Sequence, residues 1–324
     1  MTASTRGKLR ALQIGPLASL ALLTAAGFAL RFISIGKWPL WGDEGLTLLI
    51  GQWSFAHLFL APVDPTPGLY YALHKIFLGP MVDAAQARYS PLACGTLLIP
   101  AVYWMAKQAR VPALLSAALV ALSFPLIDYS QEARAYALLV LLVTFSAGFF
   151  IRWTASRSLP HLLLALLFAI LSFYTHLVSV FWIGPMCLAI LYIGRRSAVQ
   201  PLLLFVLLAV PEIHRLIVYN HVIFSWLAEA TPTEAGNTLA RATLPFRAEG
   251  WAAIAIATVM AWRGWAHRRQ LTGWARHKPW AAYTLVCLLA APLLVWAFGL
   301  VAKPIFMTRT IQVAIPGFML ALAL

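Results

Sequence analysis

Two adjacent carboxylates, Asp43 and Glu44, stand in the stretch "KWPLWGDEGLTLL" of a chain that has only ten acidic residues in 324. Trp38 and Trp41 flank them and are typical anchors at a membrane–water interface, where partial desolvation raises the pKa of a carboxyl and suits it to general-base catalysis. On an extended loop the two side chains point in different directions, so one can face a substrate while the other bonds to protein. A structural alternative stays open, in which the acids form an exposed loop pair or cap a helix that begins near Gly45.

Two further polar segments carry candidate site residues. "DPTPGLYY" contains Asp64 and Tyr70, in a stretch where prolines fix the course of the chain and tyrosines favour the interface. "FYTHLVSVFW" places His176 at a helix end among apolar neighbours. Each segment also fits a purely structural role, as a stiff turn in the first case and as a hydrogen-bonded structural histidine in the second.

The segment "YSQEARAY" brings an acid, Glu132, close to a cation, Arg134. If the segment is helical, Asp128, Glu132 and Tyr136 follow one another at i, i+4 spacing on one face. The structural alternative is a helix start whose acids are favoured by the helix dipole.

The elements that must position these residues are membrane helices. The chain is 62% hydrophobic and 10% charged, with a mean hydropathy of +0.82, whereas about a quarter of the residues of a soluble domain are charged. Apolar runs long enough to cross a bilayer as helices recur along the chain, and they are too long and too continuous for barrel strands. The sequence therefore predicts an all-α polytopic membrane protein.

We predict about ten membrane helices and one short amphipathic helix, at residues 66–80, that lies along the interface. The first apolar run is long for a signal peptide and lacks a convincing cleavage site, so we expect it to be retained. The membrane helices are expected at about 14–35, 88–106, 111–127, 136–151, 161–175, 177–194, 199–219, 251–262, 280–301 and in a last run that ends at residue 324.

The basic residues predict which ends of these helices face the cytoplasm. Fourteen of the 24 Lys and Arg residues gather in five clusters between apolar runs, at 6–10, 107–110, 152–157, 195–196 and 263–278. By the positive-inside rule these clusters and the N-terminus are cytoplasmic, and the first extracytoplasmic loop covers about 37–87. The net charge of +14 thus reflects topology and does not indicate a nucleic-acid partner.

The same alternation of helices brings every candidate segment to the outer face, including "KPIFMTRT" with Lys303 and Arg309. Cations are unexpected there, and Arg and Lys are the side chains that bind phosphate. Outer-face acids, outer-face cations and an apolar body together fit a substrate that has a phosphate at headgroup level and a long lipid tail.

The chain reads as one integral-membrane domain over residues 1–324, because no internal repeat or flexible linker divides it. Cys94, Cys187 and Cys287 fall within apolar runs and are expected to be buried small side chains, not disulfides or metal ligands. The sequence ends within an apolar run, which leaves room for a C-terminal continuation in a longer protein.

The motifs "WGDEG", "DPTPGLYY", "YSQEARAYALL", "FYTHLVSVFW" and "PIFMTRTIQVAIPG" occur in this order. In this the chain resembles, over about residues 14–320, the GT-C type of membrane glycosyltransferases. It is most similar in pattern to the bacterial proteins related to protein O-mannosyltransferases and to the aminoarabinose transferase that modifies lipid A. The acid pair and the "YSQEARAYALL" block are specific together, whereas each alone is a weak signal.

The resemblance implies an inverting transferase of the bacterial inner membrane that takes a sugar from a polyprenyl phosphate and acts on the extracytoplasmic side. Its acceptor would be a protein, a lipid or a glycan. The acid of the family's first loop matches Asp43, which would be the base, with Glu44 in support. The basic residues that hold the donor phosphate would be found among Arg134, Lys303 and Arg309.

The remaining site candidates are Asp64, which falls near a further polar loop position of the relatives, and Tyr70, Glu132 and His176. Many relatives have an Arg–Tyr pair where this chain has Arg309–Thr310, and some carry a large soluble C-terminal domain that this sequence lacks. Some use a divalent metal, and the sequence leaves metal dependence open. The absence of a Gly-rich phosphate loop agrees with a donor that carries no nucleotide.

Two other functions are alternatives to a glycosyltransferase for this sequence. A transporter or flippase of a lipid-linked sugar is expected to have ionisable residues near the bilayer midplane and repeat symmetry, which the sequence does not show. A GT-C-like subunit without activity would have no need to retain Asp43.

Overall fold

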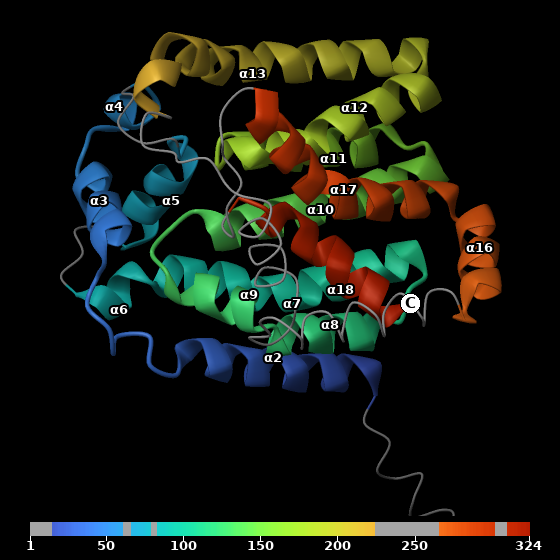
Figure 1. Ribbon diagram of the computed structural model, residues 1–324, viewed down its shortest axis with the longest axis horizontal. Coiled ribbons are helices and arrows are strands. Elements are labelled where there is room, and N and C mark those ends of the chain that lie inside the picture. The colour runs from blue at the N-terminus through green and yellow to red at the C-terminus, as the bar shows by residue number, and fades with distance from the viewer. Residues whose placement is uncertain (1–14, 61–65, 79–82, 224–265, 302–309) are drawn as a thin grey trace, which may run out of the picture.

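The computed structural model describes residues 15–60, 66–78, 83–223, 266–301 and 310–324, and within them all regular structure is helical. The longer helices lie roughly side by side, with α2 along one edge and α13 along the opposite edge (Figure 1). The short helices α3 to α6 gather at one end of this bundle, and α16 stands at the other end. The two ends of the bundle therefore differ in structure, because short helices form one end and basic turns form the other.

The bounds of the longer helices are α2 Pro16–Phe32, α7 Tyr89–Ala109, α8 Ala113–Leu122, α10 Tyr136–Ser156, α11 Leu159–Phe173, α12 Val180–Gly194, α13 Arg196–Ile223, α17 Pro279–Val301 and α18 Ile315–Ala323. The shorter helices are α3 Gly42–Gly51, α4 Phe55–Leu60, α5 Leu69–Leu78, α6 Ala84–Ala87, α9 Phe124–Asp128 and α16 Arg268–His277. Three 3₁₀ turns complete the described residues, η1 Tyr129–Gln131, η2 Leu177–Ser179 and η3 Gln312–Ala314.

Helix α10 is the centre of the bundle. It packs against α7 on one side and α11 on the other, and 78% of its most apolar window is buried. A helix that is apolar on all sides is stable only when other helices, or lipid, surround it. Because α10 begins at Tyr136, this central helix also fixes the position of Arg134 just before it.

Membrane helices are present, but the predicted number of about ten is not confirmed. Within the described residues four stretches are long and apolar enough to span a bilayer, and a fifth is added if the bent pair α8 and α9–η1 counts as one span. The four stretches are Tyr136–Ser156, Leu177–Gly194, Arg196–Val218 and Pro279–Gly299. The helix predicted at 251–262 lies outside the described residues.

The helix predicted at about 111–127 is interrupted, because the chain bends by 62° between α8 and the α9–η1 segment. Pro125 lies in the first turn of α9 and has no N–H to donate to the carbonyl of Ala121, so the helix cannot continue. The guanidinium of Arg31, from α2, donates to this carbonyl (3.1 Å) and to that of Val120 (2.9 Å). A completely buried arginine thus satisfies the carbonyls that the break exposes.

The basic turns lie at one end of the bundle, as the charge pattern predicts. Helices α7, α10 and α12 are followed by Arg110, Arg157 and Arg195, and each of these arginines has a positive φ. The negative end of the helix dipole stabilises a cation at this position. Trp274 of α16 donates to the carbonyl of Ala109 at the end of α7 (2.9 Å). The described acids of the candidate site lie at the opposite end, near α3 and η1 (Figure 1).

Candidate active site

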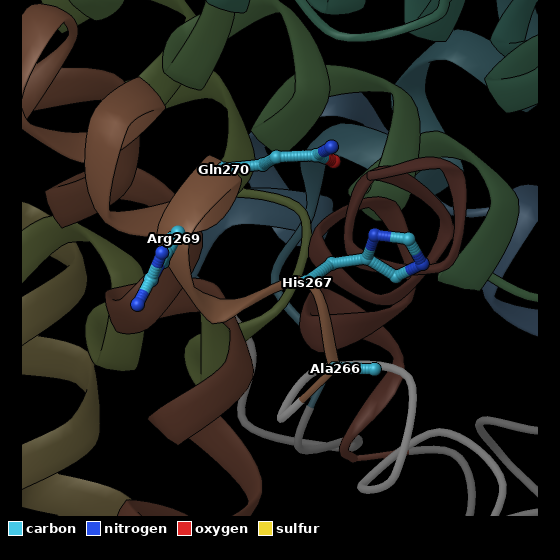
Figure 2. Close-up of a pocket in the computed structure, with 4 residues that line it drawn as sticks. All are labelled: Ala266, His267, Arg269 and Gln270. Atoms are coloured by element: carbon cyan, nitrogen blue, oxygen red, sulfur yellow. The ribbon is translucent and has the colours of Figure 1, made fainter.

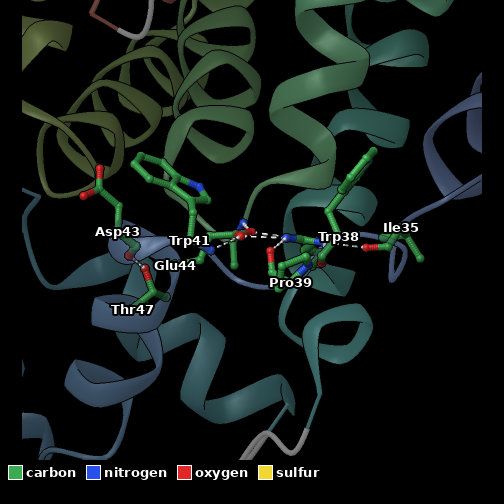
Figure 3. A network of polar contacts seen from close by, with 9 residues as sticks. Ile35, Trp38, Pro39, Trp41, Asp43, Glu44 and Thr47 are labelled. Atoms are coloured by element: carbon green, nitrogen blue, oxygen red, sulfur yellow. Dashed lines mark hydrogen bonds and ion pairs between the residues drawn. The ribbon is translucent and has the colours of Figure 1, made fainter.

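Asp43 and Glu44 lie in the first turn of α3, so the extended loop is wrong and the alternative of acids at a helix start near Gly45 is confirmed. Acids are favoured in this turn by the helix dipole, and the Glu44 carboxylate accepts a hydrogen bond from the backbone N–H of Trp41 (3.3 Å). One residue turns a helix by about 100°, so the two side chains still diverge. Asp43 is half-buried and Glu44 is completely buried. The Asp43 carboxylate points away from the contacts of Glu44 (Figure 3).

Glu44 forms a buried two-point ion pair with Arg88, which precedes α7. Arg88 Nη2 lies 2.6 Å from Glu44 Oε2, and Arg88 Nε lies 2.8 Å from Oε1. The backbone N–H of Ala133 also donates to Oε1 (2.7 Å). The hydrogen bond to Glu44 raises the pKa of Arg88, although burial works in the opposite direction. The carboxylate therefore joins α3, α7 and the chain before α10.

The other donors of Arg88 hold the chain that leads into α3. Its Nη1 donates to the carbonyls of Ile35 (2.8 Å) and Trp38 (3.0 Å), and its Nη2 donates to that of Pro39 (3.2 Å). Figure 3 shows these contacts around the guanidinium. One arginine thereby fixes both the approach to α3 and its first turn.

Arg134 is buried beside Asp43, as the predicted phosphate site requires. Its Nη1 lies 3.3 Å from the backbone carbonyl of Asp43 and 3.2 Å from the hydroxyl of Tyr71. Nη1 also lies 3.5 Å from Thr47 Oγ1, and Nη2 lies 3.3 Å from Thr66 Oγ1. These four contacts hold the guanidinium next to the candidate base.

The segment around Thr66 reaches Arg134 because loop one packs tightly on the bundle. The backbone N–H of Leu69 donates to the carbonyl of Tyr174, at the end of α11 (3.1 Å). A Cβ atom on Gly68 would come within 2.3 Å of the carbonyl oxygen of Leu58, so only glycine allows this approach. The motif "DPTPGLYY" thus has a packing role in addition to carrying Thr66 and Tyr71.

Three other predicted site residues lie at the same end. The chain at Glu132 is extended, because η1 ends at Gln131, so the condition for a helical face shared with Tyr136 is not met. Tyr70 is buried, and burial raises the pKa of its hydroxyl. The ring of His176 lies tilted against that of Tyr136, with centroids 5.6 Å apart, and its Nδ1 accepts from the backbone N–H of Val178 (3.3 Å), which fits the structural alternative.

Asp64, Lys303 and Arg309 lie outside the described residues, so their predicted roles stay predictions. The described residues contain no group of three or more His, Cys, Asp or Glu side chains that could hold a metal ion. We therefore assign no step of the chemistry to a metal.

A hollow of about 400 Å³, which we call the Trp38 pocket, opens beside the ion pair. The aromatic side chains that line it are Trp38, Trp41 and Tyr129, and the charged ones are Glu44, Arg88, Asp128 and Glu132. Asp43 does not line it, and neither do Thr47, Thr66 and Tyr71, whose hydroxyl groups contact Arg134. The pocket thus lies beside the ion pair of Glu44 and Arg88 and has an acidic, aromatic lining.

A second hollow, of about 370 Å³, lies at the start of α16 and is lined by Ala266, His267, Arg269 and Gln270 (Figure 2). It lies at the basic end of the bundle, away from the acid pair (Figure 1). None of its lining residues comes from the motifs at the other end. We therefore leave it out of the candidate active site.

Neither Arg31 nor Arg88 is among the candidate residues that the sequence indicates. Both arginines are buried. The sequence does set these two arginines apart, because neither belongs to the five basic clusters. A lone arginine within or beside an apolar run indicates a buried partner, since an unpaired charge is costly there.

Comparison with known proteins finds a likeness among solved structures. A scan against protein-family models finds no match, and no curated protein matches the chain. Among solved structures, ArnT from Cupriavidus metallidurans, crystallised with undecaprenyl phosphate, matches with a TM-score of 0.63 at 13% sequence identity. The match covers 95% of this chain and 60% of that one.

The chain has the ArnT fold. The resemblance to GT-C transferases that the motifs indicate is thereby confirmed at the level of the fold. Because a fold hosts many functions, the activity still has to be argued from the residues. The chain spans about 60% of the length of the matched ArnT chain.

Proposed function

We propose that this chain is an integral-membrane glycosyltransferase that moves a sugar, with inversion, from a polyprenyl phosphate to a hydroxyl group. The observation that carries the proposal is the half-buried Asp43 beside the buried guanidinium of Arg134, at one end of an ArnT-like fold. The undecaprenyl phosphate bound to ArnT supports a lipid of this class as the donor. The proposed reaction takes place on the extracytoplasmic side of a bacterial inner membrane.

Asp43 is the proposed base, and Glu44 is not. Each oxygen of Glu44 already accepts two hydrogen bonds, and the side chain is completely buried. A base needs a carboxylate that can reach the acceptor hydroxyl. The Asp43 carboxylate points away from those contacts and is half-exposed (Figure 3).

In the proposed step the acceptor oxygen bonds to the anomeric carbon while the bond from that carbon to the phosphate oxygen breaks. The acceptor proton passes to Asp43, and the bonding electron pair leaves with the polyprenyl phosphate. Arg134 stabilises the charge that grows on the phosphate, which is the main electrostatic demand of the transition state. Lys303 and Arg309 are proposed as further phosphate ligands.

Arg134→Gln is expected to weaken binding of undecaprenyl phosphate by about tenfold or more, since a hydrogen bond to a charged group contributes about 1.5–3 kcal/mol. Native mass spectrometry of the protein in nanodiscs measures this binding. Lys75→Gln is the matched control, because Lys75 lies at the same end and donates to the carbonyl of Trp53 (2.7 Å). Equal binding of undecaprenyl phosphate by the wild type and the Arg134 variant would contradict the proposed role of Arg134 as a phosphate ligand.

The proposed orientation is tested by two cysteines at opposite ends of the bundle. Asp83 and Arg276 are both exposed, at the acidic and basic ends respectively. In spheroplasts, Asp83→Cys should react with an impermeant maleimide, and Arg276→Cys should react only after the membrane is opened. The reverse pattern would show that the acidic end faces the cytoplasm.

A further inference from the structure

The exposed cations of the basic end have no acidic partner in the part of the chain that the structure describes. The exposed Lys and Arg side chains in its turns and in α16 are Lys107, Arg110, Arg152, Arg157, Arg195, Arg196, Arg269 and Arg276. Within the described residues, none of these side chains forms an ion pair. Like charges gathered on one surface repel one another, so this surface favours a negative charge supplied from outside the chain.

Side-chain contacts join the basic turns into one surface. Trp274 of α16 donates to the last carbonyl of α7 (2.9 Å). Arg157, which follows α10, donates to the carbonyl of Ile193 in α12 (3.4 Å). The ring centroid of Trp280, in α17, lies 6.1 Å from that of Tyr192, also in α12. The basic segments are therefore neighbours in space, although they are far apart in the sequence.

Helix α16 has the form of a helix that lies on a membrane surface. Figure 1 shows it across the end of the bundle, roughly at right angles to the long helices. Arg269, Thr272 and Arg276 are exposed at i, i+3, i+7 spacing, whereas Leu271 and Trp274 are half-buried, and the helix packs against α17. Since the long helices of an integral membrane protein cross the bilayer, an amphipathic helix in this position lies along its surface.

The side chains around α16 suit the level of the lipid headgroups. Tyr192 is 77% exposed and Trp280 is half-buried, and such aromatic side chains are enriched where a membrane meets water. The hollow of about 370 Å³ at the start of α16 is lined by Ala266, His267, Arg269 and Gln270 (Figure 2). Its polar lining side chains can all donate hydrogen bonds, and none of them is an acid. Phosphate oxygens accept such bonds.

We propose that the basic end binds the headgroups of anionic phospholipids, with α16 at headgroup level and Arg269 and Arg276 facing the phosphates. A soluble acidic protein would match the charge of this surface, but it would not account for the exposed tyrosine and the helix that lies across the bundle. Anionic lipid matches all three features. The inference goes beyond the proposed function and does not depend on it, because neither donor nor acceptor enters it.

Native mass spectrometry of the detergent-solubilised protein tests this surface by titration with phosphatidylglycerol and with zwitterionic phosphatidylcholine of the same chain length. The wild type is expected to bind phosphatidylglycerol more tightly. Arg269→Gln/Arg276→Gln should weaken that binding by about tenfold or more, since each Lys or Arg near an anionic lipid surface adds about fivefold. The matched control Arg269→Lys/Arg276→Lys keeps both charges and should stay within about twofold of the wild type.

Lys37→Gln removes an exposed cation at the acidic end and should also leave the binding of phosphatidylglycerol within about twofold of the wild type. Equal binding of the two lipids by the wild type would overturn the proposal. So would an equal loss in the Lys37 and α16 variants, because the preference would then come from net charge and not from this surface.

The position of α16 is tested by a nitroxide on Thr272→Cys, in a protein whose three native cysteines are replaced by alanine. In nanodiscs of phosphatidylglycerol, electron paramagnetic resonance should place the label at headgroup depth, partly shielded from a water-soluble nickel chelate. A label as accessible as one free in solution would show that α16 stands clear of the bilayer, as expected for a soluble partner. Both measurements omit donor and acceptor, so a protein without transferase activity would still give the expected results.

Discussion

Asp43→Asn is expected to lower the rate of sugar transfer from a polyprenyl-phosphate donor by about 10²–10⁴-fold, the usual contribution of a general base. Asparagine has nearly the same shape but cannot take the acceptor proton. The fold should survive, because Thr47 (3.1 Å) and Arg134 (3.3 Å) bond to the backbone carbonyl of residue 43, which the substitution leaves in place. The rate is measured with the purified protein in nanodiscs and a radiolabelled lipid-linked sugar.

Asp83→Asn serves as the matched control for this prediction. Asp83 is an acid at the same end, and it caps α6 by accepting from the backbone N–H of Gln86 (2.8 Å), which an asparagine oxygen can also do. We expect its transfer rate to stay within about twofold of wild type, since exposed caps of this kind affect stability only slightly. Transfer by the Asp43 variant at the wild-type rate would assign the base to another group.

Glu44→Gln is expected to cost about 3–5 kcal/mol of unfolding free energy, because it leaves the buried charge of Arg88 without its partner. Glu44 is completely buried and joins α3 to Arg88 and to the chain before α10. We therefore expect a larger loss of stability from this replacement of one carboxylate oxygen by an amide nitrogen than from the other substitutions proposed here. The unfolding free energy is measured by steric trapping in mixed micelles, and binding of undecaprenyl phosphate reports whether Arg134 stays in place.

A double-mutant cycle separates the ion pair from other roles of Glu44. Glu44→Gln/Arg88→Gln should be less destabilised than the sum of the two single variants, because it removes both charges together. Additive losses would mean that the pair does not couple α3 to α7. A Glu44 variant with normal stability but no transfer would instead make Glu44 a chemical participant.

Several features of the site could be predicted from local sequence. The family resemblance of "WGDEG" and "YSQEARAY" points to Asp43 and Arg134, and the structure brings these two residues into contact. The helical register could not be predicted, because the first turn of α3 and the extended chain at Glu132 depend on one hydrogen-bonded network. Arg88 was missed for the same reason, since its partners lie 44 to 53 residues away in the sequence.

By itself, the sequence determined the helical membrane architecture and the separation of charge between two ends, because both follow from composition and from the periodic spacing of apolar runs and basic turns. Only the tertiary structure decided how the two acids differ in burial and in partners. Asp43 and Glu44 have nearly the same chemistry and adjacent positions, and they differ because packing buries Glu44 against Arg88 and leaves Asp43 half-exposed beside Arg134. Burial and partners are long-range properties, and for this reason the division between structural acid and candidate base appears only when the helices are assembled.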